Sequence, residues 1–172
     1  MPRFEDIAQF ERPAYQCDMP WWDLEGWIER HALIPGAHVD FDPPYQRAHV
    51  WTSEQQVAYV EFCLRGGESA RNIYFNCSSW MGAFNTPIEI VDGKQRVMAV
   101  RLFMADELPA FGHTIDEYED PPPMLSASLR IHVHKLQTRA EVIRWYLDLN
   151  YAGTPHTEEE RERVRRMLEE EC

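Results

Sequence analysis

Apolar and polar positions alternate along the chain in a way that predicts a small sheet and several helices. Leu129, Ile131 and Val133 recur at every second position, which is the period of a strand with one buried face. Shorter apolar stretches predict three further strands, over 39–41, 72–76 and 87–91. Helical spacing predicts five helices, over 21–31, 52–64 and 94–105, from 138 and from 157. This order indicates an α+β fold with α/β-like character, in which helices flank a small mixed sheet.

Other signals set the ends of these elements. Capping-box pairs, a threonine followed three residues later by Gln or Glu, mark three helix starts: Thr52–Gln55, Thr138–Glu141 and Thr157–Glu160. Prolines in residues 1–20 predict an irregular N-terminal arm, and residues 157–172 predict a highly charged last helix. The length of 172 residues favours a single domain over 1–172.

Composition and charge narrow the possible partners. Hydrophobic residues make up 44% of the chain and aromatic residues 12%, which is typical of a folded globular protein. The formal net charge of −12 repels phosphate backbones at long range and disfavours non-specific binding of duplex DNA. A local cationic pocket for one nucleotide or one flipped base is still compatible with this charge.

The cysteines and the apolar runs bear on the compartment. No two of the four cysteines form a CxxC pair, so we expect reduced, structural thiols rather than a zinc site. No apolar run reaches the length that spans a membrane, and the first residues are too charged for a signal peptide. We therefore expect a cytoplasmic protein in a bacterial host cell that contacts no membrane.

The segment "IEIVDGKQRVMAV" passes from a strand pattern into a helical one at Asp92 and Gly93. The first helical turn carries Lys94, Gln95 and Arg96, although the positive end of the helix dipole favours acidic residues there. A strand–turn–helix corner also leaves backbone N–H groups unpaired, and these groups form an anion site. Two cations at this end of a helix are favourable if an anion binds between them.

Each residue of this corner has a role in that interpretation. Gly93 has no Cβ and lets a ligand approach the backbone, while Lys94 and Arg96 add positive charge. Asp92 could hold a metal ion, accept from a sugar hydroxyl or orient a nucleophile. The alternative is an ordinary capped turn with Lys94 and Arg96 in solvent.

A second cluster lies in "PPYQRAHVW". Arg47 follows Gln46 in a loop stiffened by two prolines, and Tyr45 and Trp51 flank it. An aromatic ring beside a guanidinium is a common arrangement for holding a base or a sugar phosphate. For Trp51 we favour a core position ahead of the helix, whereas we interpret Arg47 as a ligand contact.

A third cluster is "LNYAGTPHTEEE". Asn150 ends a helix, Gly153 permits a tight turn, and Thr154 offers a hydroxyl group. The same residues are also compatible with a simple connection between two helices.

Taken together, the three clusters resemble the N-terminal domain of GmrSD-type restriction proteins, a ParB-like group near the ParB–sulfiredoxin superfamily. The resemblance runs from about Trp21 to the end of the chain. The family pattern falls at Tyr45-Gln46-Arg47 with Trp51, at Asp92-Gly93-Lys94-Gln95-Arg96, and at Asn150, Gly153-Thr154-Pro155 and Glu160. Lys94 replaces the usual glutamine, and His156 stands where leucine is common.

The resemblance implies a domain that binds ATP or GTP, with phosphohydrolase activity and a role in DNA restriction, DNA modification or phage–host conflict. It implies catalytic roles for Asp92, Arg96 and Arg47, with Asp92 also assisting Mg²⁺. It implies nucleotide contacts at Tyr45, Gln46, Gly93, Lys94, Gln95, Asn150 and Thr154. A separate nuclease or a host defence protein is the implied protein partner.

Two other functions are open from the sequence. One is a DNA-modifying phosphotransferase or nuclease of the same superfamily, acting on DNA through a local basic pocket. His132 and His134 are the only histidines of one strand face, and we interpret them as solvent-facing. No P-loop or HExxH motif occurs. We therefore do not expect this chain to cleave DNA alone. The other is a non-enzymatic acidic protein that acts on a defence complex.

Overall fold

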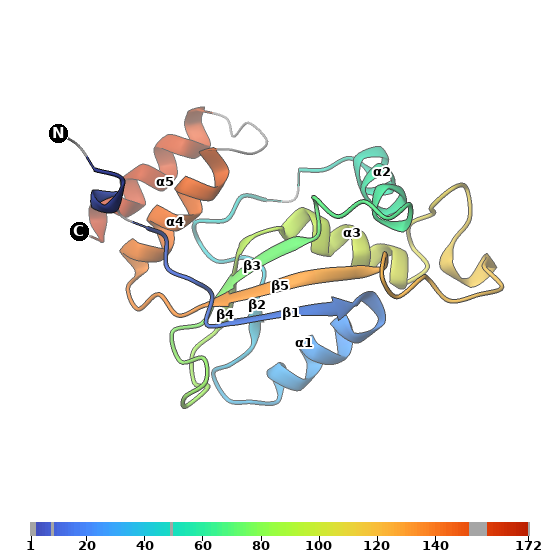
Figure 1. Cartoon of the computed structure of the whole chain (residues 1–172), viewed down its shortest axis with the longest axis horizontal. Coiled ribbons are helices and arrows are strands. Elements are labelled where there is room, and N and C mark those ends of the chain that lie inside the picture. Colours follow the sequence, from blue (N-terminus) through green and yellow to red (C-terminus); the bar gives the residue numbers. More distant parts are fainter. Residues whose placement is uncertain (1–2, 8, 49, 152–157, 172) are drawn as a thin grey trace.

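A computed structural model describes residues 3–7, 9–48, 50–151 and 158–171 (Figure 1). Within these ranges the strands are β1 Tyr15–Pro20, β2 Val39–Asp40, β3 Asn72–Asn76, β4 Ile88–Asp92 and β5 Ser128–His134. The α-helices are α1 Leu24–Ala32, α2 Ser53–Leu64, α3 Lys94–Met104, α4 Arg139–Tyr151 and α5 Glu158–Glu170. Single 3-10 turns lie at Phe4–Asp6, Trp21–Asp23 and Ile115–Glu117. These elements confirm the predicted α+β fold.

The five strands form one mixed sheet in the order β1-β5-β3-β4-β2. β1 runs antiparallel to β5, β5 parallel to β3, β3 antiparallel to β4, and β4 parallel to the two-residue β2. β4 therefore lies inside the sheet, with β3 and β2 as its neighbours. Its C-terminal end at Asp92 leads through Gly93 into α3. The corner singled out in the sequence therefore lies at the C-terminal end of an interior strand.

The two faces of the sheet build two apolar clusters. Alternate strand residues such as Ile73, Ile90 and Ile131 face a large cluster that includes side chains of α1, α2 and α3. On the opposite face, Val91 of β4 belongs to a smaller cluster with residues of α4 and Val164 of α5. In Figure 1, α4 and α5 lie side by side at one end of the sheet, and α2 lies near its other end. Among the described helices, none is both long and apolar enough to cross a membrane.

Two of the three predicted helix caps are present. The Thr52 hydroxyl accepts from the backbone N–H of Gln55, whose side chain accepts in turn from the Thr52 N–H. Thr138 and Glu141 exchange the same pair of bonds at the start of α4. Thr157 lies outside the described residues. α5, from Glu158, agrees with the predicted charged C-terminal helix.

The prediction of an irregular arm over 1–20 is wrong for residues 15–20. These residues form the edge strand β1, and Asp18 makes a bidentate ion pair with Arg130 of β5 at 2.7 and 3.1 Å. Tyr15, Cys17 and Met19 alternate with polar residues, so a strand signal was present in the sequence. Pro20 indicated an irregular segment instead. Proline is tolerated in an edge strand, however, because one side of that strand needs no ladder hydrogen bonds.

The interpretation of His132 and His134 as solvent-facing is also wrong. His134 is only 5% exposed, and its ring lies 4.0 Å from the ring of Trp145 on α4. His132 stacks on Tyr74 at 4.7 Å, and its Nε2 lies 2.9 Å from Oδ1 of Asn72. The alternating pattern identified the second face of β5 correctly, but Trp145 of α4 covers His134 and the Tyr74 side chain of β3 stacks on His132.

Burial of His134 predicts a pH-dependent stability. Desolvation, reinforced by His132, lowers the pKa of His134 from 6.5 to about 4. Between these values the unfolded chain binds the proton and the folded chain does not, so stability falls as the pH is lowered through this window. We expect His134→Gln to reduce the slope of unfolding free energy against pH between pH 5 and 6.5, by at most about 1.4 kcal/mol per pH unit.

Urea unfolding at several pH values measures this slope. His113→Gln is the matched control, because His113 is an exposed histidine and its loss removes the same titratable ring. Equal slopes in wild type and His134→Gln would contradict the effect of burial.

Candidate functional site

A polar cavity of about 200 Å³ lies where β4 passes into α3. Its wall consists of Gln46, Arg47, Trp51, Val91, Asp92, Gly93, Lys94, Gln95, Arg96, Tyr146, Leu149 and Asn150. The fold thus brings together residues from all three sequence clusters, which are far apart along the chain. Tyr146 and Leu149 of α4 line the cavity as well and were not singled out from the sequence.

Gly93 shapes the corner for a reason internal to the fold. Its φ of 101° is left-handed, and no side chain caps the start of α3, so the first backbone N–H groups of the helix are uncapped. A Cβ at this position would lie 2.6 Å from Cδ1 and 3.3 Å from Cα of Ile73 on β3. Glycine is therefore required at this position by the backbone angle and by the close approach of β3. The approach of a ligand to its backbone stays a prediction.

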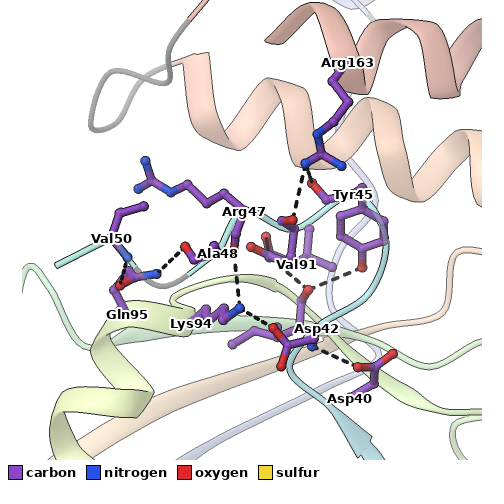
Figure 2. A network of polar contacts seen from close by, with 12 residues as sticks. Asp40, Asp42, Tyr45, Arg47, Ala48, Val50, Val91, Lys94, Gln95 and Arg163 are labelled. Atoms are coloured by element: carbon purple, nitrogen blue, oxygen red, sulfur yellow. Dashed lines mark hydrogen bonds and ion pairs between the residues drawn. The ribbon is translucent and has the colours of Figure 1, made fainter. Parts of the chain in front are cut away.

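Lys94 is buried and its charge is already compensated. Its Nζ forms an ion pair with Asp42, whose carboxylate is largely exposed, and donates to the backbone oxygen of Arg47 at 3.2 Å (Figure 2). The alternative of a solvated Lys94 is thereby excluded. The lysine fixes the loop that carries Arg47 to the start of α3.

Two glutamine side chains hold the same loop. Oε1 of Gln95 accepts from the N–H groups of Val50 and Trp51 at 3.1 and 3.2 Å, and its Nε2 donates to the oxygen of Ala48 at 3.3 Å. Nε2 of Gln46 donates to two backbone oxygens at the end of β4, at 3.0 and 2.7 Å. These amides are occupied by the backbone, so their role in the structure is to join two of the sequence clusters.

Arg163 of α5 grips the loop from the opposite side. Its Nη1 donates to the oxygen of Pro44 at 2.7 Å, and its Nη2 donates to the oxygens of Gln46 and Tyr45 at 3.3 and 3.5 Å (Figure 2). We call residues 44–51 the anchored loop. Five consecutive carbonyls of this loop, from Pro44 to Ala48, accept hydrogen bonds from side chains distant in the sequence.

Arg96 and Asp92 pair with each other at the cavity wall. Nη2 of Arg96 lies 2.8 Å from Oδ2 of Asp92, and its Nη1 donates to the backbone oxygen of Asn72 on β3. Both side chains are partly exposed, at 23% and 27%. The Asp92 carboxylate therefore offsets the charge of Arg96 through Oδ2. Its other oxygen, Oδ1, accepts no hydrogen bond from the described residues.

Arg47 differs from the other cations of the cavity. Within the described part of the chain its guanidinium makes no hydrogen bond and no ion pair, and Figure 2 shows it extending away from the network that holds its backbone. It lies close enough to Tyr146 to act on it electrostatically. Burial raises the pKa of the Tyr146 phenol to about 12, and the charge of Arg47 opposes this rise. The Tyr146 hydroxyl is therefore protonated at neutral pH.

Tyr45 is not a cavity residue, and its predicted contact with a nucleotide is corrected. Its side chain is completely buried, its ring packs against the ring of Tyr146 at 5.3 Å, and its hydroxyl donates to the oxygen of Ile90 at 3.3 Å. Desolvation raises the pKa of this phenol well above its usual range. Tyr45 anchors the loop in the smaller apolar cluster.

The remaining predicted residues fall in different places. Asn150 lines the cavity, and its Nδ2 donates to the backbone oxygen of Tyr146 at 2.7 Å. Thr154 lies outside the described residues. Trp51 contacts the cavity and also packs against Tyr59 of α2 at 5.5 Å, so its predicted packing role and a place in the wall are both present.

Sequence reasoning missed Asp42 and Arg163. Asp42 directly precedes the two prolines of the second cluster, and an acidic residue there is a reasonable partner for a lysine at a helix start. Arg163 belongs to a helix dense in charge, where most side chains are solvated. No local pattern separates it from its neighbours, because its three acceptors lie about 118 residues away along the chain.

The residues present fit Mg²⁺ only together with a phosphate ligand. Asp92 is the one carboxylate of the cavity wall, and the described residues contain no group of three or more His, Cys, Asp or Glu side chains placed to hold a metal. Mg²⁺ is commonly held by one or two carboxylates plus substrate phosphates and waters. A metal site made by the protein alone is not supported by this wall.

No family model matches the chain, and no curated protein or solved structure is significantly similar to it. The resemblance to GmrSD-type restriction proteins therefore remains a prediction from three motifs.

Gly93→Ala tests the internal role of the glycine. We expect the substitution to cost about 2–4 kcal/mol of unfolding free energy, because the backbone is left-handed and the new Cβ overlaps Ile73. Gly66→Ala is the matched control, since Gly66 has a φ of 91° with no atom within 4 Å of the added Cβ. Urea unfolding measures both, and an equal loss in the two variants would contradict a role for the Ile73 contact.

Gln95→Ala tests the side-chain anchoring of the loop. The change leaves the N–H groups of Val50 and Trp51 and the oxygen of Ala48 without Gln95, so we expect a loss of about 1–3 kcal/mol. Amide hydrogen exchange at Val50 and Trp51 should accelerate in the same variant. Gln137→Ala, at an exposed glutamine, serves as control, and unchanged exchange at the two amides would show that Gln95 does not hold the loop.

Proposed function

We propose that the chain binds a nucleoside triphosphate, with the phosphate groups in the cavity between α3 and the anchored loop. The observation that carries this proposal is the guanidinium of Arg47, which has no partner among the described residues and lines a cavity at an uncapped helix start. Arginine binds phosphate through two parallel charge-assisted hydrogen bonds, and free N–H groups at a helix start favour the same ligand.

The balance of charge in the cavity supports an anionic ligand. Arg47, Lys94 and Arg96 line it together with a single carboxylate, in a protein whose net charge is −12. Asp42 offsets the charge of Lys94 and Asp92 offsets that of Arg96. The charge of Arg47 is left over, so this guanidinium is the expected principal contact with phosphate.

The size of the cavity restricts which part of a nucleotide it takes. Its volume of about 200 Å³ is below the range of about 300 Å³ and more that is usual for pockets enclosing a drug-sized ligand. Phosphate groups fit this space, and the base would lie outside it, nearer to the surface. We therefore propose that ATP and GTP bind with similar affinity and that inorganic triphosphate binds in the same place.

Hydrolysis of the bound nucleotide is the reaction that we propose for this site. Arg96 fixes Oδ2 of Asp92, and Oδ1 is left to accept from a water or to join Mg²⁺. The protein would act by positioning the phosphates and neutralising their charge, and Mg²⁺ would supply further neutralisation when bound. A role in DNA restriction or phage–host conflict is proposed from the resemblance of the three motifs.

Isothermal titration calorimetry with ATP, GTP and inorganic triphosphate, each with and without Mg²⁺, tests the proposal. We expect Arg47→Ala to weaken binding about 10- to 100-fold, since a hydrogen bond to a charged group contributes about 1.5–3 kcal/mol. Arg65→Ala is the control, because Arg65 is an exposed arginine that does not line the cavity. If wild-type protein bound none of the three ligands under either condition, the proposal would be lost.

A further inference from the structure

We propose that Arg163 is a positioning residue for the cavity, and that α5 sets the affinity of a site that its arginine does not line. This inference rests on the proposed phosphate site. The part of the inference that concerns structure alone is that Arg163 holds the anchored loop in place. This part can be measured without any ligand.

Arg163 makes an unusual set of contacts for an exposed side chain. Its guanidinium donates to three successive backbone oxygens, those of Pro44, Tyr45 and Gln46, at 2.7, 3.5 and 3.3 Å. Arginine presents its N–H groups in a rigid planar fork, which suits several acceptors at once. Lysine carries the same charge on one nitrogen and cannot span this row of oxygens in the same way.

Side chains rather than backbone hydrogen bonds hold the first half of the anchored loop: the Gln46 amide and the buried Tyr45 ring attach it to β4, and Arg163 binds its carbonyls. Its only backbone–backbone hydrogen bond among the described residues runs from the N–H of Gln46 to the oxygen of Pro43. The oxygens that Arg163 binds are therefore satisfied by this side chain rather than by a ladder. Loops without ladder bonds sample more conformations once such a contact is removed.

The helix that carries Arg163 is itself fixed. Val164, the next residue, is 1% exposed and belongs to the apolar cluster that also contains Tyr45 and Tyr146. α5 therefore reaches the anchored loop twice, through this cluster from within and through Arg163 from outside. Figure 2 shows Arg163 entering from the helical side of the loop, opposite Lys94.

The position of Arg47 depends on both sides of this clamp. Lys94 binds the backbone oxygen of Arg47, and Arg163 binds the three oxygens directly before it. The Arg47 guanidinium has no side-chain partner among the described residues, so its placement at the cavity follows from its backbone. Loss of the Arg163 contacts lowers the fraction of molecules in which Arg47 is placed to bind, and the apparent affinity falls by that fraction.

Arg163→Lys separates position from charge, and Arg163→Gln provides a second variant. We expect both to weaken binding of ATP and of inorganic triphosphate about five- to tenfold by calorimetry. In Arg163→Lys the dependence of affinity on salt concentration stays as in wild type, because the charges that touch the ligand are unchanged. Arg47→Ala instead reduces that dependence. Arg166→Lys is the matched control, since Arg166 lies on the same helix and, within the described residues, donates to the Glu162 oxygen rather than to the loop.

Amide signals of residues 45–48 in ¹H–¹⁵N NMR spectra report on the loop without ligand. We expect them to shift or broaden in Arg163→Lys and to be unchanged in Arg166→Lys. Wild-type affinity in Arg163→Lys, or unchanged loop signals, would overturn the inference. If wild-type protein bound no ligand, the phosphate site would be lost, and the NMR comparison alone would then decide whether Arg163 positions the loop.

Discussion

The described residues of 44–51 have almost no regular backbone hydrogen bonding, and side chains from distant parts of the chain replace it. Gln95 and Lys94 of α3 bind one half of this anchored loop, and Arg163 of α5 binds the other. These side chains supply the hydrogen bonds that a strand or helix would otherwise supply to the loop carbonyls. The cavity wall and the placement of Arg47 depend on this set of side-chain-to-backbone bonds.

The same bonds explain the unusual composition of the first turn of α3. Cations at the positive end of a helix are unfavourable, but Lys94 is paired with Asp42, and Arg96 with Asp92. The internal partners remove most of the local cost and leave less positive charge in the cavity than a count of cations suggests. A site for an anion then depends on Arg47, whose charge has no such partner among the described residues.

Much of the fold could be predicted from local patterns. The alternation at Leu129, Ile131 and Val133 placed β5, and two capping pairs placed the starts of α2 and α4 within a residue. The edge strand β1 was missed because the prolines at positions 2, 13 and 20 indicated an irregular segment, although only Pro20 lies in the strand. The second face of β5 was misread because a polar alternate position is solvated only if no helix covers it, and α4 covers His134.

The sequence by itself determined the strand–turn–helix corner and several of the residues around the cavity, because dihedral preferences, caps and side-chain periods are local. Only the tertiary structure decided what those residues do. Tyr45 is buried and anchors the loop, and the side chains of Gln46 and Gln95 bind backbone groups. Gly93 is required because β3 approaches it closely at Ile73. Each of these roles depends on which distant part of the chain lies within hydrogen-bonding or contact distance. Arg163 shows the same limit most clearly, because nothing in its own helix indicates the three oxygens that it binds.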